Sequence, residues 1–272
     1  MKRSLRKFPP VPRKDFEAYV HIVRRLRREC PWDRKQTHRS LRDSLIEETY
    51  EVVESLDLND VGNLKHELGD LLLHIVLQAT IAEQRGEFTL ADPLRASADK
   101  LVRRHPHVFG TRRVRNAEEV KRNWEQIKME EGRTSLLQGV PEGLPSLQRA
   151  LRVQERAAKV GFDWKRPDDV WKKVREELDE LRETLRHGTR ERREEEFGDL
   201  LFALVNYARF LDINPENALR QTVRKFIRRF RHIEETLSKR GRTPHDASLE
   251  EMDKIWNAIK RRERKSARPS GG

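Results

Sequence analysis

The stretch EEEFGDLLFALVNYA, Glu194 to Ala208, decides the fold because a close copy of it occurs earlier in the chain. That copy is KHELGDLLLHIVLQA, Lys65 to Ala79, which starts 129 residues before the other. Each contains an acid pair spaced E-x-x-D, a glycine between the two acids, and then a long apolar segment. Alternating runs of β-branched residues are scarce in the chain, so both stretches are predicted to be helices.

The repetition extends well beyond these two stretches. At the same offset, LIEETYEVVESL (Leu45–Leu56) aligns with VREELDELRETL (Val174–Leu185). Two further pairs of segments are similar at slightly different offsets: Asp99–His105 with Arg224–Phe230, and Glu118–Lys128 with Glu250–Lys260. Self-similarity of this extent indicates an internal duplication. The sequence therefore predicts an all-α fold with two tandem helical-bundle domains.

Composition suggests where the copies begin and end. Residues 132–146 contain three Gly and two Pro and are expected to form the linker. The two repeats are then expected at residues 15–131 and 147–260. Basic tails are expected at residues 1–14 and 261–272, and the second tail is expected to be disordered.

Each copy is expected to contain the same series of helices. The first carries E-E-x-x-E, the second starts at E-x-x-D, the third carries a basic cluster, and a short last helix contains a Trp. Gly62 and Gly188 are expected to separate the first two helices of each copy.

The formal net charge of +12 is concentrated at the ends of the chain. Residues 1–14 carry six positive and no negative charges, and residues 258–272 carry six positive and one negative. The body is nearly neutral and lacks the positive excess of a surface that follows a phosphate backbone. We therefore interpret the tails as solvated ends, with weak nonspecific contact to RNA or another polyanion through the tails as the alternative.

Cysteine usage and hydropathy indicate a cytoplasmic protein. Cys30 is the only cysteine, so no internal disulfide forms, which fits a reducing compartment. The longest apolar runs fall far short of the roughly 20 residues that cross a bilayer. No apolar signal segment follows the basic N-terminus, so neither export nor a membrane location is expected.

The acids of the second copy are the strongest candidates for a metal site. Helical spacing places Glu177 and Glu180 on one face, with Glu176 four residues before Glu180. Taken alone, this motif also fits a solvated acidic face. The next helix is apolar around most of its circumference, so Asp199, beside Glu196, is expected to be buried. Buried carboxylates need a cation, and hard oxygen ligands favour Mg²⁺ or Mn²⁺.

A ferritin-like di-iron site is the structural competitor, because it also uses Glu residues on helices. It requires Glu-x-x-His on two helices. Here the fourth position of the motif is Asp70 or Asp199, and His74, one turn beyond Asp70, has Ala203 as its counterpart. The pattern therefore disfavours di-iron.

A basic cluster on a later helix is a candidate for binding phosphates. Lys225, Arg228 and Arg229 lie at i, i+3 and i+4, and Arg binds phosphate oxygens through paired N–H groups. A solvated basic face is the alternative interpretation. Trp256 is a candidate to stack on a base, and a core anchor is the alternative for it.

Two further cations distinguish the copies. Lys173 and Arg192 each lie four residues before an acid of the second copy, whereas their counterparts in the first copy are Ser44 and Asn63. The second copy is therefore predicted to be the better-equipped phosphate site. The first copy retains its acids and is expected to bind metal while being slower, differently selective or chiefly structural.

These motifs resemble the MazG family of nucleoside triphosphate pyrophosphohydrolases, which is marked by E-E-x-x-E followed by E-x-x-D. The likeness covers nearly the whole chain and includes CPWDRKQTHRSL near the start, GVPEGLPSLQRALRVQERAAKVGFDW at the junction, and KFIRRF. The resemblance implies an all-α homodimer that requires Mg²⁺ and hydrolyses nucleoside triphosphates to the monophosphate and pyrophosphate.

The resemblance also implies roles for individual residues. The implied metal ligands are Glu177, Glu180, Glu196 and Asp199, with Glu48, Glu51, Glu67 and Asp70 as their matches in the first copy. The implied phosphate contacts are Lys173, Arg192, Lys225, Arg228 and Arg229, and Trp256 is the implied nucleotide contact. Either Glu176 or Glu180 is expected to orient the attacking water.

The predicted function is therefore metal-dependent hydrolysis of nucleoside triphosphates, with the broad specificity of a housekeeping enzyme. A noncatalytic helical adaptor, which binds nucleotides or RNA through its basic tails, is the alternative. Pyrophosphate release that survives removal of both tails distinguishes the enzyme from the adaptor.

Overall fold

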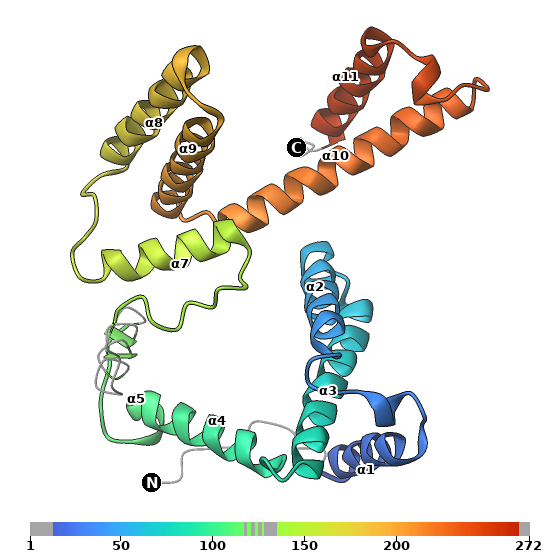
Figure 1. Ribbon diagram of the computed structural model, residues 1–272, viewed down its shortest axis with the longest axis vertical. Coiled ribbons are helices and arrows are strands. Elements are labelled where there is room, and N and C mark those ends of the chain that lie inside the picture. Colours follow the sequence, from blue (N-terminus) through green and yellow to red (C-terminus); the bar gives the residue numbers. More distant parts are fainter. Residues whose placement is uncertain (1–12, 117–118, 121–122, 125–126, 128–134, 267–272) are drawn as a thin grey trace, which may run out of the picture. The chain divides into compact units, whose positions relative to one another are not determined.

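The computed structural model describes residues 13–116, 119–120, 123–124, 127 and 135–266 (Figure 1). These residues form helices and turns without a β-strand, which confirms the predicted all-α fold. The chain divides into two compact units, Met1–Glu131 and Gly132–Gly272. No helix in the described part of the chain is both long enough and apolar enough to cross a bilayer.

The first unit is built around a helical hairpin. Helix α2 (Arg42–Leu58) packs against α3 (Val61–Gln84), and α1 (Arg13–Glu29) packs against α3 as well. The first unit also contains the 3₁₀ turn η2 (Asp33–Lys35), the helix α4 (Ala91–Arg104) and the four-residue helix α5 (Pro106–Phe109). Apolar side chains from α1, α3 and the start of α2 form the core: Val20, Val23, Leu41, Val76, Leu77 and Ile81.

The second unit repeats the hairpin (Figure 1). Helix α8 (Pro167–His187) packs against α9 (Arg190–Phe210), and α7 (Ser146–Ala158) packs against α9. Helix α10 (Pro215–Ser238) contacts α7 and α9 and then packs against α11 (Leu249–Ser266), with η3 (Pro244–Asp246) between the two. Val170 and Val174 of α8 and Val205 of α9 are buried.

Side-chain caps fix where the acid-bearing helices of the hairpins begin. Asp60 caps α3 and Thr189 caps α9, each accepting a hydrogen bond from the backbone N–H three residues later, at 2.9 and 3.3 Å. Such caps satisfy N–H groups that have no partner inside the helix. Glu67 and Glu196 each lie seven residues after the cap, which places both about two turns into their helices.

The two hairpin turns are closed by different residues. In the second unit, Gly188 is required because a Cβ there would lie 2.7 Å from the backbone oxygen of Thr184. In the first unit, Asn59 takes the left-handed conformation with φ of 53°, which Asn tolerates better than most residues. Gly62 lies inside α3, so the prediction that it separates the helices is wrong.

The last helix is longer than the sequence suggested. Residues 261–266, which we expected to begin a disordered tail, belong to α11. Glu263 in this segment pairs with Arg228 and Arg229, which attaches the end of α11 to α10. The predicted tail residues 1–12 and 267–272 lie outside the described residues, as does most of the helix predicted at Glu118–Lys128.

Candidate active site

Three carboxylates of the second unit meet between the helices of the hairpin. Glu177 projects from α8, and Glu196 and Asp199 project from α9. One carboxylate oxygen from each lies within 4.8 Å of the other two. Negative charges at this separation repel one another, and a divalent cation with oxygen ligands relieves that repulsion. The fold therefore places an acid of α8 next to two acids of α9, as the sequence predicted.

The depth of these acids differs from the prediction. Glu177 is only 6% exposed, whereas Asp199 is exposed. The prediction that apolar neighbours bury Asp199 is wrong for the single chain, because α7 and α8 leave part of the circumference of α9 uncovered. Phe197 and Phe202 of α9 accordingly remain 53% and 45% exposed. The acid removed from water is Glu177, whose negative charge requires compensation.

Lys173 provides part of that compensation. Its Nζ lies 2.7 Å from Oε1 of Glu176 and 2.7 Å from Oε1 of Glu177. These hydrogen bonds, first the one to Glu176 and then the one to Glu177, raise the pKa of Lys173 and keep it charged. The structure thus places Lys173 beside the acids, and its role as a phosphate contact stays a prediction.

Glu180 belongs to the same electrostatic group without being one of the three closest acids. Partial loss of hydration, followed by the charges of Glu177 and Glu196, raises the pKa of Glu180 above its ordinary value. Glu176 is held by Lys173 instead. The two candidates for orienting water therefore differ in surroundings, because Glu176 is hydrogen-bonded to Lys173, whereas Glu180 lies near the negative charges of Glu177 and Glu196.

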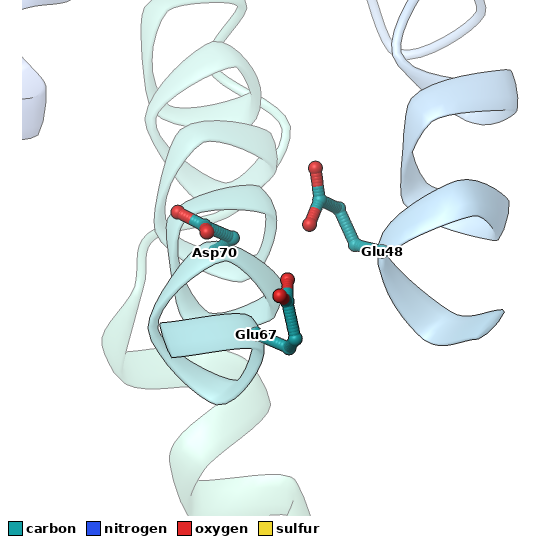
Figure 2. Close-up of side chains that lie close together, drawn as sticks. All are labelled: Glu48, Glu67 and Asp70. Atoms are coloured by element: carbon teal, nitrogen blue, oxygen red, sulfur yellow. The ribbon is translucent and has the colours of Figure 1, made fainter. Parts of the chain in front are cut away.

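The first unit contains a matching group of acids, shown in Figure 2. Glu48 projects from α2 toward Glu67 and Asp70 of α3, and one oxygen of each lies within 4.8 Å of the others. A hydrogen bond to Glu67 raises the pKa of Glu51, and loss of hydration raises the pKa of Glu48. The acids of both copies thus gather in the same way.

A cavity of about 780 Å³ lies beside the acids of the second unit, with Lys173, Glu177 and Asp199 in its lining. Most of the remaining lining is apolar or aromatic: Leu137, Val153, Phe162, Trp164, Phe202 and Ala203. This volume is within the usual range for small-molecule sites, about 300 to 1,000 Å³. The arrangement offers charged groups and an apolar surface to one ligand.

One ion pair fixes the loop that supplies the aromatic lining. Arg209 of α9 donates to both carboxylate oxygens of Asp163, with Nη1 3.0 Å from Oδ2, and its Nε donates to Oδ1 of Asn206 at 3.1 Å. Asp163 directly precedes Trp164 in the loop between α7 and α8. The ion pair therefore holds Trp164 near α9.

The structure brings Arg192 to the acids but places the α10 cluster elsewhere. Nε of Arg192 lies 3.8 Å from Oε1 of Glu196. Lys225, Arg228, Arg229 and Trp256 are outside the lining of the cavity as far as the described residues show.

The α10 cluster is organised around α11. Arg228 and Arg229 each lie 2.6 Å from a carboxylate oxygen of Glu263, and the Arg229 guanidinium lies 5.3 Å from the centre of the Trp256 ring. Trp256 also packs against Phe226. Their predicted contacts with phosphate and nucleotide stay predictions.

Sequence reasoning assigned no role to Gln154, to Trp164 or to Glu263. For Gln154 a signal existed, since it lies three residues after Leu151 and seven after Leu147, on the apolar face of α7. Glu263 is the one acid in the basic segment 258–272, which also set it apart. The position of Trp164 depends on a tertiary ion pair that spacing does not reveal.

Known proteins are similar to this chain over most of its length. The family model for the MazG nucleotide pyrophosphohydrolase domain matches twice, at residues 36–109 and 166–234. A nucleoside triphosphate pyrophosphohydrolase/pyrophosphatase MazG from Thermotoga maritima is 45% identical over 250 residues, which cover 90% of this chain and 95% of the relative. A nucleoside triphosphate pyrophosphohydrolase from Escherichia coli K12 is 43% identical over 257 residues, 91% of this chain and 98% of the relative.

A crystal structure of a mazG-related protein from Thermotoga maritima also matches, with 30% identity, a TM-score of 0.38, and coverage of 42% of this chain and 98% of that one. Both family-model matches include a complete acidic group, Glu48 to Asp70 in the first and Glu177 to Asp199 in the second. With two such matches and relatives aligned over nearly their full length, the chain belongs to the MazG family of nucleotide pyrophosphohydrolases.

Proposed function

We propose that this protein hydrolyses nucleoside triphosphates to the monophosphate and pyrophosphate, with Mg²⁺ or Mn²⁺ held in the second unit. The observation that carries the proposal is the group Glu177, Glu196 and Asp199, whose oxygens lie within 4.8 Å of one another beside a cavity of about 780 Å³. The names of the relatives from Thermotoga maritima and Escherichia coli support the same reaction.

The residues present fit a hard divalent cation. All three close ligands are carboxylates, and Glu177 is 6% exposed and paired with the ammonium group of Lys173. Lys173 is shared with Glu176, and Arg192 lies 3.8 Å from Glu196, so these two cations do not balance the gathered carboxylates. Bound Mg²⁺ supplies Lewis-acid polarisation of phosphoryl oxygens, and Glu177, Glu180, Glu196 and Asp199 are the residues proposed to hold it.

Side chains of the second unit are proposed to orient the attacking water and to neutralise charge on the phosphates. Lys173 uses two of its three N–H groups on Glu176 and Glu177, and its third is proposed to donate to a phosphate oxygen. We assign the orientation of the attacking water to Glu180, because the carboxylate of Glu176 is engaged by Lys173. Arg192, exposed beside Glu196, is proposed to neutralise charge on the departing pyrophosphate.

The basic cluster on α10 is proposed to contact the same substrate in a homodimer. Arg228 and Arg229 carry guanidinium groups suited to phosphate, and Glu263 keeps them in place until an anion competes for them. Along α10, a row of apolar side chains is exposed in the single chain, namely Leu219, Val223, Phe226 and Ile227. Such a row is expected to be covered by a second copy.

We further propose that catalysis belongs mainly to the repeat at residues 147–260, with broad specificity. The repeat at 15–131 has its acids but carries Ser44 and Asn63 where the second carries Lys173 and Arg192. Residues 132–146 are proposed to act as the linker.

The proposed reaction is tested by incubating the full chain with a mixture of nucleoside triphosphates and Mg²⁺ and measuring pyrophosphate. Release is expected with Mg²⁺ and not with excess chelator, and it is expected to survive removal of residues 1–12 and 267–272. Glu180→Gln is expected to lose turnover while the helical circular dichroism signal is unchanged. Monophosphate and pyrophosphate absent under all conditions would rule the proposal out.

A further inference from the structure

One buried polar group in the cavity of the second unit has no partner. Gln154 of α7 lines the cavity and is 7% exposed. Its Nε2 donates to the backbone oxygen of Phe202 at 2.8 Å, whereas its Oε1 has no hydrogen-bond partner. Leaving a buried acceptor unpaired is unfavourable, so a partner is expected in the functional state.

The orientation of this amide follows from its neighbour. A backbone carbonyl oxygen accepts hydrogen bonds and does not donate them, so the atom of Gln154 that faces the oxygen of Phe202 is the nitrogen. The remaining oxygen is therefore an acceptor. What it lacks is an N–H or O–H donor.

The lining of the cavity indicates which part of a bound nucleotide supplies such a donor. If phosphates bind at Lys173, Glu177 and Asp199, the rest of the nucleotide occupies the remaining part of the same cavity. Phe162, Trp164 and Phe202 line that part and offer ring faces on which a planar base stacks. The edge of the base then supplies polar hydrogen atoms, because the sugar and phosphates lie toward the acids.

We propose that Gln154 determines base specificity by accepting a hydrogen bond from an N–H group on the edge of the base. This inference rests on the proposed function and deepens it. The favoured substrates are triphosphates whose base carries an amino group on the edge that faces Gln154. Replacing that group with hydrogen leaves the Gln154 oxygen unpaired, which disfavours the analogue.

A purely structural role for Gln154 makes a different prediction. Its bond to Phe202 ties α7 to α9, so loss of the side chain alone loosens the cavity for every substrate equally. A specificity role lowers turnover only for substrates that carry the donor. The ratio between two matched substrates therefore separates the two roles.

The experiment uses two substrate pairs on the full chain with Mg²⁺: ATP with purine riboside triphosphate, and CTP with pyrimidin-2-one riboside triphosphate. Each analogue lacks only the amino group. For at least one pair, wild type is expected to favour the amino substrate in kcat/KM by roughly 5- to 150-fold, the equivalent of about 1 to 3 kcal/mol. Gln154→Met is expected to bring that ratio close to one, mainly by slowing the amino substrate.

Gln148→Met, on the same helix but outside the cavity, is the matched control and is expected to keep the wild-type ratio. Gln154→Asn, which withdraws the acceptor but keeps an amide, is the second variant if the Met variant does not fold. A ratio near one in wild type, or an unchanged ratio in both Gln154 variants, overturns the inference while leaving the proposed hydrolysis intact.

If no triphosphate is hydrolysed, the proposed function fails, and calorimetric titration with the same pairs decides the inference separately. A binding preference for the amino substrate that Gln154→Met removes supports it. Equal binding of both members, or no binding of either, overturns it.

Discussion

Glu177 and Asp199 contribute to one acidic group from different depths, and their roles follow from that difference. Glu177 is 6% exposed and paired with Lys173, whereas Asp199 is exposed in the single chain. Glu177 is therefore the acid of this group that lies away from solvent, and Asp199 is the acid that remains accessible to solvent and to ligands. Removal of either charge is expected to reduce affinity for a divalent ion.

Asp199→Asn tests the proposed role of Asp199 in binding the divalent ion. It disturbs packing little, because Asp199 is exposed. It replaces one ligand oxygen with an amide nitrogen and is expected to lower kcat/KM by at least about 100-fold, as losses of transition-state charge stabilisation do. Pyrophosphate release at saturating Mg²⁺ measures the effect. Asp70→Asn, the same change at the matching position of the first unit, is the control and is expected to retain most of the activity. An equal loss in both variants contradicts the assignment of catalysis to the second unit.

The titration of Glu180 gives a second prediction at this scale. Its pKa is raised in the folded protein from the ordinary value near 4.5. The folded state therefore loses stability as the pH rises from that value through the folded pKa, and the loss is complete above it. Mg²⁺ offsets the repulsion of the ionised acids. The rise in Tm on adding Mg²⁺ is thus expected to be larger at pH 7.5 than at pH 5, with a stabilisation of about 2.7 kcal/mol at 100 times the Kd.

Glu180→Gln removes one of the repelling charges. Without metal at pH 7.5, its Tm is expected to exceed that of wild type, and its rise with Mg²⁺ is expected to be smaller. Glu183→Gln, on the next turn of α8 and outside the acidic group, is the control. If Mg²⁺ raises the Tm equally at both pH values, the acids of the α8–α9 hairpin are not the site at which Mg²⁺ binds.

At the scale of elements, the α8–α9 hairpin determines whether the acids of its two helices meet. Thr189 caps α9 two turns before Glu196, and Gly188 lets the chain turn tightly after α8. Both features lie in the sequence H-G-T between the helices. The turn therefore fixes how far α9 is advanced along α8, and with it the distance between Glu177 and Asp199.

Gly188→Ala is expected to destabilise the second unit by about 1 to 3 kcal/mol, since its Cβ would lie 2.7 Å from the backbone oxygen of Thr184 and the turn must shift. Urea unfolding followed by circular dichroism measures the change. Gly143→Ala is the matched control, because a Cβ at Gly143 meets no atom within 4 Å, and it is expected to change stability little. Similar midpoints for both variants would mean that the turn accommodates the Cβ.

The sequence predicted which helices exist more accurately than which faces of those helices other helices bury. E-E-x-x-E and E-x-x-D placed Glu177, Glu196 and Asp199 on two helices, and periodicity sufficed because their spacing is local. The burial of Asp199 was predicted wrongly because apolar composition does not show which face another helix covers. The contact between Glu263 and Arg229 joins residues 34 positions apart on different helices, and no local pattern encodes it.

At the scale of the whole molecule, duplication has produced two units with the same acidic hairpin and different surroundings. The first unit has the tight apolar core of Val23, Val76 and Ile81, whereas the second has an open cavity beside its acids. In the second unit, α9 and α10 both leave large apolar side chains exposed. We expect another copy of the chain to cover this apolar surface.

The oligomeric state is therefore the last prediction. Leu219 and Val223 lie four residues apart on α10, are 52% and 48% exposed, and line none of the acidic cavity. Wild type is expected to sediment as a dimer with twice the chain mass of 32.3 kDa, and the double substitution L219E/V223E is expected to sediment as a monomer, because four desolvated carboxylates would face each other across the interface. The control is Leu249→Glu at the start of α11, which is 79% exposed and expected to leave the dimer intact. A wild-type chain that sediments at 32.3 kDa would remove the homodimer and require the exposed apolar row of α10 to have another partner.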